Sequence, residues 1–206
     1  MKPNKIRIIG ITGGVGSGKT EVLSYIKDKY NCTVIFADEV AHKVQEPGQD
    51  CYGELIALLG ADVLAEDGRI DRTRMAEKIF ADGNLLKGVN QIVHPAVKRY
   101  ILDEIDREKG EGKIDFLFIE AALLIEDGYV NIADELWYVF ASEDVRRERL
   151  KSSRSYSDAK IDGILGNQLS EEEYKKHCKV WIDNGGSKHN TYEQIDKKLE
   201  EYLWQR

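Results

Sequence analysis

The segment GGVGSGKT, residues 13–20, constrains this chain more than any other feature. Its first and sixth residues are glycine and it ends in Lys19 and Thr20, which is the Walker A pattern of a phosphate-binding loop. Glycines let such a loop point successive backbone N–H groups at phosphate oxygens, and the helix that follows presents its positive end there. The pattern predicts that Lys19 reaches the β- and γ-phosphates of a nucleotide, and that the Thr20 hydroxyl helps to hold Mg²⁺.

The residues around this loop predict the local structure that the motif needs. Residues 6–11 are a short β-branched run typical of a buried strand, and Val22, Ile26 and Tyr30 recur at helical spacing after the loop. Further strands are predicted over four later segments: residues 33–36, 115–119, 136–140 and 180–182. Strands that alternate with helices predict an α/β fold with a doubly wound, mostly parallel five-stranded sheet.

The long stretch between the second and third predicted strands is expected to be helical. Short helices are predicted over residues 54–59 and 72–80. Apolar residues four apart from Val93 to Ile105 predict a longer amphipathic helix, with Pro95 near its start, where proline is tolerated. We expect residues 40–113 to form a helical substrate-binding lobe.

Serines precede three predicted helices near the C-terminus and are expected to act as N-caps: Ser142, Ser157 and Ser170. A hydroxyl oxygen at such a position accepts a hydrogen bond from an early backbone N–H of the helix. Thr191 is expected to cap the last helix in the same way.

Positive charge is concentrated in residues 146–154 of an otherwise acidic chain. A lid that folds over a triphosphate needs cations, because charge builds on the phosphoryl group during transfer. The alternative is a solvated helix face with ion pairs, which accounts for some of these residues. Arg154 lies beyond the predicted basic helix, in a polar stretch expected to be mobile, and is our candidate for a catalytic lid arginine.

Two acidic residues follow predicted strands, at the edge where ligands bind in such sheets. Asp38 comes just after the second strand, where a carboxylate can take the proton from an acceptor hydroxyl or contact Mg²⁺. The alternative is a turn or helix N-cap aspartate. Glu120 ends the third strand and is a candidate for a water-bridged contact to Mg²⁺, with a solvated glutamate as the alternative.

Charge and cysteine content limit the class of function. The formal net charge of −7 argues against a nonspecific binder of duplex DNA. The three cysteines lie far apart and fit free thiols in a reducing compartment. No segment predicts a membrane span or a signal peptide. We therefore expect a cytoplasmic protein that acts on small molecules, with neither nucleic acid nor membrane as a partner; the sequence leaves the oligomeric state open.

Beyond the loop, the chain resembles the dephospho-coenzyme A kinase family. The blocks that carry the resemblance keep their order over nearly the whole chain: ITGGVGSGKT, VIFADEVAHKV, GADVLAEDGRIDR, IVHP, ALLIE and WIDNGG. Many families share the first block, whereas the combination is much more specific. The resemblance implies a P-loop kinase core, a helical lobe for the coenzyme A precursor, and a lid over residues 142–168. It also implies transfer of the γ-phosphoryl group of ATP, with Mg²⁺, to the ribose 3′-hydroxyl of dephospho-coenzyme A.

The resemblance further implies roles for individual residues. ATP is expected to contact the loop and the start of its helix: Gly13, Gly14, Val15, Gly16, Ser17, Gly18, Lys19, Thr20 and Glu21. Thr12 is expected beside the phosphates, His94 in the substrate lobe, and Asn184 in a loop that approaches the adenine. Asp38 matches the acid that acts as a base or orients the acceptor, and Arg154 corresponds to a lid arginine.

The chain departs from the family's pattern at several positions. Phe36, Ala122, Cys178 and Lys179 replace the residues usual there, and Glu120 stands where aspartate is common. None of these changes removes Lys19, Thr20 or Asp38. We expect them to affect how tightly the acceptor is held and to lower the activity.

Two alternative functions share the loop. Another small P-loop kinase, acting on a nucleoside, a nucleotide or a shikimate-like acceptor, would have the same fold and differ only in the distal blocks. A guanine-nucleotide switch would need an N-K-x-D motif on a late strand, and the sequence has none.

Overall fold

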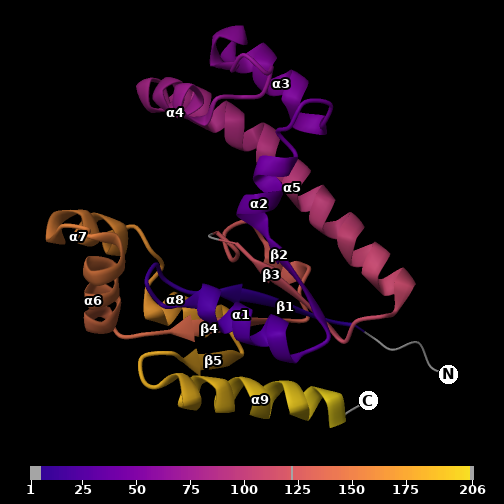
Figure 1. Cartoon of the computed structure of the whole chain (residues 1–206), viewed down its shortest axis with the longest axis vertical. Helices are drawn as coiled ribbons and strands as arrows, with labels where there is room; N and C mark the ends of the chain where they lie inside the picture. Colours follow the sequence, from indigo (N-terminus) through magenta and orange to yellow (C-terminus); the bar gives the residue numbers. More distant parts are fainter. Residues whose placement is uncertain (1–5, 122, 205–206) are drawn as a thin grey trace. The chain divides into compact units, whose positions relative to one another are not determined.

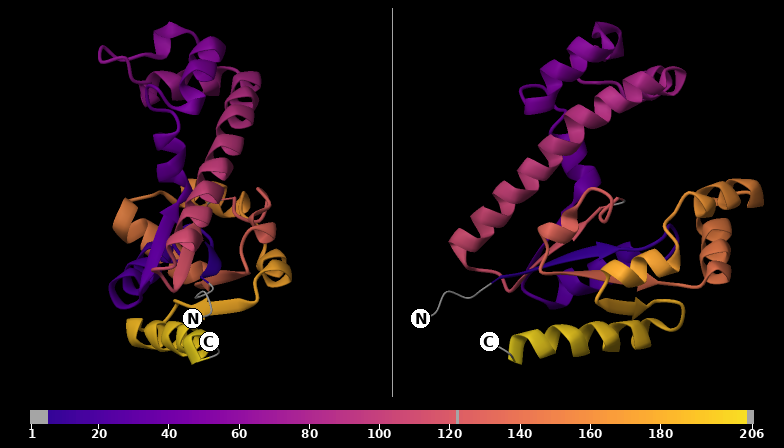
Figure 2. Two further views of the ribbon diagram at one scale, coloured as in Figure 1. Left: turned by 90° about the vertical axis from the view of Figure 1, so that its right-hand side faces the viewer. Right: turned by 180° about the vertical axis from the view of Figure 1, so that it is seen from behind.

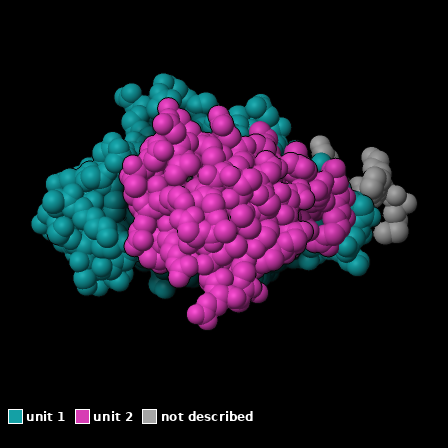
Figure 3. Space-filling view, turned by 90° about the horizontal axis from the view of Figure 1, so that it is seen from above, with its two compact units in different colours: residues 1–34, 108–206 teal, residues 35–107 magenta. Residues whose placement is uncertain are grey.

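The computed structural model describes residues 6–121 and 123–204. The chain divides into two compact units, shown in different colours in Figure 3. Unit 1 consists of residues 1–34 and 108–206, and unit 2 of residues 35–107. Unit 1 contains the phosphate-binding loop.

Unit 1 is built on a five-stranded sheet with the strand order β2-β3-β1-β4-β5 (Figure 1). The strands are β1 (Arg7–Thr12), β2 (Cys32–Phe36), β3 (Phe116–Glu120), β4 (Glu135–Phe140) and β5 (Val180–Asp183). β1 pairs in parallel with β3 and β4, and β4 pairs in parallel with β5. The central strands are buried on both faces, which explains their continuous apolar runs. The five predicted strands and the doubly wound, parallel arrangement are confirmed.

The helices of unit 1 begin where the sequence predicts them to begin, with one exception. α1 (Lys19–Lys29) follows the glycine loop directly. Three later helices follow the expected serine caps: α6 (Glu143–Arg154), α7 (Asp158–Gly166) and α8 (Glu171–His177). The hydroxyl of each capping serine accepts a hydrogen bond from the backbone N–H three residues later. These three predicted caps are therefore confirmed.

Two predicted helix boundaries in unit 1 are wrong. α6 continues to Arg154, so this arginine ends the helix instead of lying in a mobile stretch; Ser155 then turns the chain with a φ angle of 52°. α9 (Lys188–Trp204) begins before Thr191, which therefore lies inside the helix. The cap is Ser187, whose hydroxyl accepts a hydrogen bond from the N–H of Asn190 at 3.3 Å.

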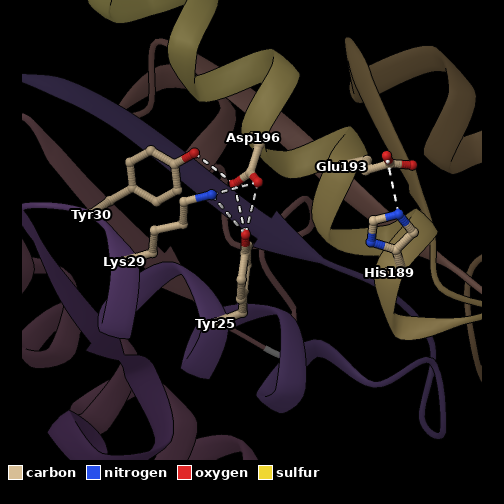
Figure 4. A network of polar contacts seen from close by, with 6 residues as sticks. All are labelled: Tyr25, Lys29, Tyr30, His189, Glu193 and Asp196. Carbon is tan, nitrogen blue, oxygen red and sulfur yellow. Dashed lines mark hydrogen bonds and ion pairs between the residues drawn. The ribbon is translucent and has the colours of Figure 1, made fainter.

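One carboxylate, that of Asp196, fastens α9 to α1 (Figure 4). It accepts hydrogen bonds from the hydroxyls of Tyr25 and Tyr30 at 2.8 and 2.7 Å, and from the ammonium of Lys29 at 2.6 Å. Burial raises the pKa of Asp196, but the hydrogen bonds from Lys29, Tyr30 and Tyr25 together outweigh burial and leave the pKa below its usual value. The folded state therefore favours the charged carboxylate.

Replacing Asp196 by alanine is expected to lower the melting temperature at pH 7 by about 3–6 °C, because lost hydrogen bonds to a partly buried charge cost about 1–2 kcal/mol. The lowered pKa stabilises the fold above the unfolded carboxyl pKa of about 3.9, and this stabilisation is lost as the pH falls through the folded-state pKa. Thermal melts at pH 7 and at acidic pH test both points. Glu193→Ala is the control, since Glu193 is exposed and, among the described residues, its one ion pair is with exposed His189 at 3.2 Å (Figure 4). Equal melting temperatures for the parent and Asp196→Ala at pH 7 would contradict the prediction.

Unit 2 consists mainly of helices. They are α2 (Ala37–Lys43), α3 (Asp50–Leu59), the short η1 (Ala61–Val63), α4 (Arg72–Ala81) and most of α5 (Gly83–Glu111), the long helix in both views of Figure 2. α3 and α4 confirm two predicted helices. No helix within residues 6–121 and 123–204 is both long and apolar enough to cross a membrane.

The predicted start of the long helix is wrong. α5 begins at Gly83, so Pro95 and the neighbouring His94 lie inside the helix and not at its start. An interior proline removes one backbone hydrogen bond and costs about 3 kcal/mol. The helix persists because an apolar stripe on α5, including Val89, Val97 and Ile101, is buried on both sides of the proline in sequence.

Candidate active site

The phosphate-binding loop joins the buried end of β1 to the first turn of α1. Gly13, Gly16 and Gly18 have positive φ angles of 154°, 85° and 90°, which residues with side chains rarely adopt. At Gly18, a Cβ atom would also lie 2.2 Å from the side-chain nitrogen Nδ2 of Asn184. The backbone path and this close approach both require glycine.

Oxygen atoms of the loop backbone and of β3 lie around the side-chain ammonium of Lys19. Its ammonium nitrogen Nζ donates to the carbonyl oxygen of Gly13 at 2.7 Å and lies 3.7 Å from Oε1 of Glu120. Glu120 ends β3, and the parallel register pairs it with Ile11 of β1. The ends of two neighbouring strands thus place a cation and a carboxylate side by side, with side chains only 17% and 16% exposed.

The residues around the loop fit one kind of metal site. The Thr20 hydroxyl and the Glu120 carboxylate are oxygen ligands of the type that Mg²⁺ prefers. The described residues contain no group of three or more His, Cys, Asp or Glu side chains that could hold a metal ion. This donor set fits an Mg²⁺ ion that keeps several waters and takes its other ligands from substrate phosphates.

Two side chains, which we call the loop brace, hold the backbone carbonyls of the loop. The guanidinium of Arg149, on α6, donates to the carbonyl oxygens of Gly16, Ser17 and Asn184 at 3.3, 3.2 and 2.7 Å. Asn184 follows β5 and is 5% exposed; its Nδ2 also donates to the Ser17 carbonyl, at 2.8 Å. Oδ1 of Asn184 lies 3.0 Å from the Thr191 hydroxyl, which donates to it. Arg149 and Asn184 therefore fix the loop from two different elements.

Sequence reasoning missed Arg149. The signal is the basic run on α6, in which helical spacing puts Arg146 and Arg149 on the same face as buried Leu150. Arg147 lies off this face and pairs with the carboxylates of Glu143 and Asp162 at 2.8 and 2.6 Å. The sequence shows which side chains share this face of α6. It does not show that the face packs against the phosphate-binding loop.

Two further candidate residues, Thr12 and Arg154, lie in unit 1. Thr12 ends β1 with its side chain buried. The guanidinium of Arg154 lies 6.0 Å from the ring centre of Tyr156. A hydrogen bond with Arg154 is the largest of the effects that lower the pKa of Tyr156. The role of Arg154 in a lid stays a prediction.

Two candidates belong to unit 2. Asp38 is exposed in the first turn of α2, directly after β2, and Phe36 occupies the N-cap position of that helix. Asp38 is therefore not the N-cap, although a carboxylate in a first turn still favours the helix dipole. His94 lies inside α5. The substrate roles of both residues stay predictions, and Ala122 lies outside the described residues.

The sequence and the fold both match known kinases. The model of the family described as dephospho-CoA kinase matches residues 7–190. A dephospho-CoA kinase from Carboxydothermus hydrogenoformans is 34% identical over 96% of this chain and 95% of that protein. A crystal structure from Thermus thermophilus, 28% identical, superposes with a TM-score of 0.77 over 95% of this chain and 97% of its own.

A dephospho-CoA kinase from Campylobacter jejuni superposes with a TM-score of 0.71, covering 94% of this chain and 96% of its own. At 21% identity this likeness speaks for the fold alone. The family match, by contrast, includes the loop, the three carbonyls held by Arg149, and the distal segment with Asn184. The chain belongs to the dephospho-CoA kinase family.

Proposed function

We propose that this protein transfers the γ-phosphoryl group of ATP to the ribose 3′-hydroxyl of dephospho-coenzyme A, giving coenzyme A and ADP. The observation that carries the proposal is the Walker A loop with Lys19 beside Glu120, in a chain that matches the family from residue 7 to residue 190. The alternative of a different small acceptor is not favoured, because the family match extends through the distal blocks.

Phosphoryl transfer depends mainly on positioning and on charge stabilisation. The first backbone N–H groups of α1 lack intrahelical acceptors and are directed at the loop, where they bind phosphate oxygens. Lys19 exchanges its contact with the Gly13 carbonyl for the β- and γ-phosphate oxygens. Thr20, and Glu120 through a water molecule, would hold Mg²⁺, which would supply positive charge to stabilise the transferring phosphoryl group.

The acceptor is handled by residues of unit 2 in this proposal. Asp38 orients the ribose hydroxyl and takes its proton as the bond to phosphorus forms. Residues 40–113, with His94, form the lobe that receives dephospho-coenzyme A, and residues 142–168 form the lid. Support for this division comes from the unit boundaries at residues 34/35 and 107/108 and from the resemblance of the sequence blocks.

The proposal extends to the cellular setting. We infer a cytoplasmic enzyme with small-molecule substrates and without nucleic acid or membrane partners. The acidic net charge of −7 and the free thiols of Cys32, Cys51 and Cys178 support this inference.

The direct test is an ATP-dependent assay with a panel of acceptors, read by product mass. Dephospho-coenzyme A is expected to gain one phosphoryl group, at the 3′-hydroxyl, far faster than adenosine, a nucleoside monophosphate or shikimate. A higher kcat/KM on any of those three acceptors would overturn the proposal. Omitting Mg²⁺ should abolish turnover and its return should restore it.

Replacing Arg149 by methionine is expected to raise the KM for ATP about tenfold and to lower the melting temperature, because three carbonyls lose a charged donor. Steady-state kinetics and thermal melts measure both effects. Arg147→Met is the matched control on the same helix, since Arg147 pairs only at the surface. A parent-like KM in Arg149→Met would show that the loop brace does not serve nucleotide binding.

A further inference from the structure

A second arginine of α6, Arg146, lies directly against the phosphate-binding loop. A Cβ atom at Gly14 would lie 2.1 Å from Nη1 of Arg146 and 2.7 Å from Oε1 of Gln168. A Cβ atom at Gly16 would lie 3.3 Å from the Cβ atom of Arg146. The space that glycine leaves at residue 14 is thus filled by a guanidinium and an amide.

The guanidinium of Arg146 is only partly satisfied. Nη1 donates to Oε1 of Gln168 at 2.8 Å. Within the described part of the chain, Arg146 forms no ion pair, and its buried Nε has no hydrogen-bond partner. A positive charge therefore lies at the loop without a carboxylate to balance it.

Neighbouring cations of α6 differ from Arg146 in this respect. Arg147 pairs with two carboxylates and Lys151 with the carboxylate of Asp158. Arg149 donates to three backbone carbonyls as part of the loop brace. Arg146 combines contact with the loop and an unpaired charge.

A buried N–H group without a partner costs about 1–3 kcal/mol. Buried donors in native structures nearly always have a hydrogen-bond partner, so a donor without one calls for an explanation. A phosphate oxygen supplies one, because a guanidinium donates two parallel, charge-assisted hydrogen bonds to it. With Nη1 directed at Gln168, the edge formed by Nε and Nη2 is the one suited to this bidentate contact.

We propose that Arg146 binds the phosphate chain of the nucleotide beside Gly14, and that Gln168 holds its guanidinium in position. The inference rests on the proposed use of a nucleoside triphosphate, but not on the identity of the acceptor. Gln168 keeps its contact to Nη1, while Nε and Nη2 donate to phosphate oxygens. Arg146 is then a binding residue and Gln168 a positioning residue.

Direct nucleotide titrations on the full chain test the proposal. In Arg146→Met, the Kd values for ATP and ADP are expected to rise on the order of tenfold, because a charged bidentate contact is lost. The Kd for adenosine, which has no phosphate, should not change. Arg147→Met is the matched control and should bind all three ligands like the parent.

Two further variants separate a binding role from a structural one. Arg146→Lys keeps the positive charge but lacks the planar guanidinium that donates two parallel hydrogen bonds. It is expected to bind ATP more tightly than Arg146→Met but more weakly than the parent. Gln168→Glu should draw Arg146 into an ion pair that competes with phosphate, and so weaken ATP binding without removing the arginine. If Arg146→Met does not fold, ATP binding by Gln168→Glu still tests the proposal.

The outcomes are distinct. An ATP Kd in Arg146→Met within about twofold of the parent value overturns the inference, and so does an equal loss of adenosine affinity, which marks a structural role. Weaker ATP and ADP binding with unchanged adenosine binding supports it. Should the parent bind ATP but fail to phosphorylate dephospho-coenzyme A, the proposed function fails while this inference stands.

Discussion

Replacing Lys19 by methionine is expected to lower kcat on the order of 10³-fold while leaving the fold intact, because the transferring phosphoryl group loses its positioned cation. In the structure, the Lys19 ammonium lies between the Gly13 carbonyl and the carboxylate of Glu120. Steady-state kinetics with ATP and dephospho-coenzyme A measure the loss, and circular dichroism with thermal melting measures the fold.

Lys27→Met is the control for the lysine variant. Lys27 lies on the same helix, α1, but its side chain is exposed and away from the first turn. Its replacement should leave kcat and KM unchanged. A Lys19→Met enzyme with a kcat within about tenfold of the parent would remove the lysine from transition-state stabilisation.

Replacing Asp38 by asparagine is expected to lower kcat by about 10²-fold or more, because a positioned base contributes at least that much. The melting temperature should fall by no more than about 1–4 °C, since the Asp38 side chain is exposed, asparagine has nearly its shape and only the charge in the first turn of α2 is lost. The KM for ATP should also stay near the parent value if Asp38 acts only on the acceptor. Kinetics at saturating ATP with varied dephospho-coenzyme A measure the effect.

Glu39→Gln is the control for the aspartate variant, because Glu39 is the adjacent exposed acid in the same helix turn of α2. It should retain the parent kcat. A normal kcat in Asp38→Asn would leave only a structural role for Asp38 in the first turn, where a carboxylate favours the helix dipole.

The sheet and the loop could be predicted because their signals are local. Walker A spacing, a buried apolar run before it and helical periodicity after it all specify the same strand–loop–helix unit. Serine caps are local as well, and three of them lie at the predicted helix starts. The approach of Glu120 to Lys19 follows from the parallel register of β3 and β1, once two strand ends meet at one edge of the sheet.

The features that could not be predicted depend on contacts between distant segments. Arg149 and Asn184 are 35 residues apart, and their meeting at the Ser17 carbonyl requires the packing of α6 and β5 around the loop. The interior position of Pro95 was missed because tertiary burial of the helix outweighed the local preference of proline for a helix start. The end of α6 is predicted too early, so the sequence places Arg154 in a mobile stretch although it lies in the last turn of the helix.

The loop brace also fixes the direction of an amide dipole. A trans peptide unit is planar, so its C=O and N–H bonds point in opposite directions. Because Arg149 and Asn184 hold the carbonyl of Ser17, the N–H of Gly18 in the same peptide unit is turned away from both side chains. This donor is therefore oriented before a phosphate arrives, and this one amide dipole needs no rearrangement when a phosphate binds.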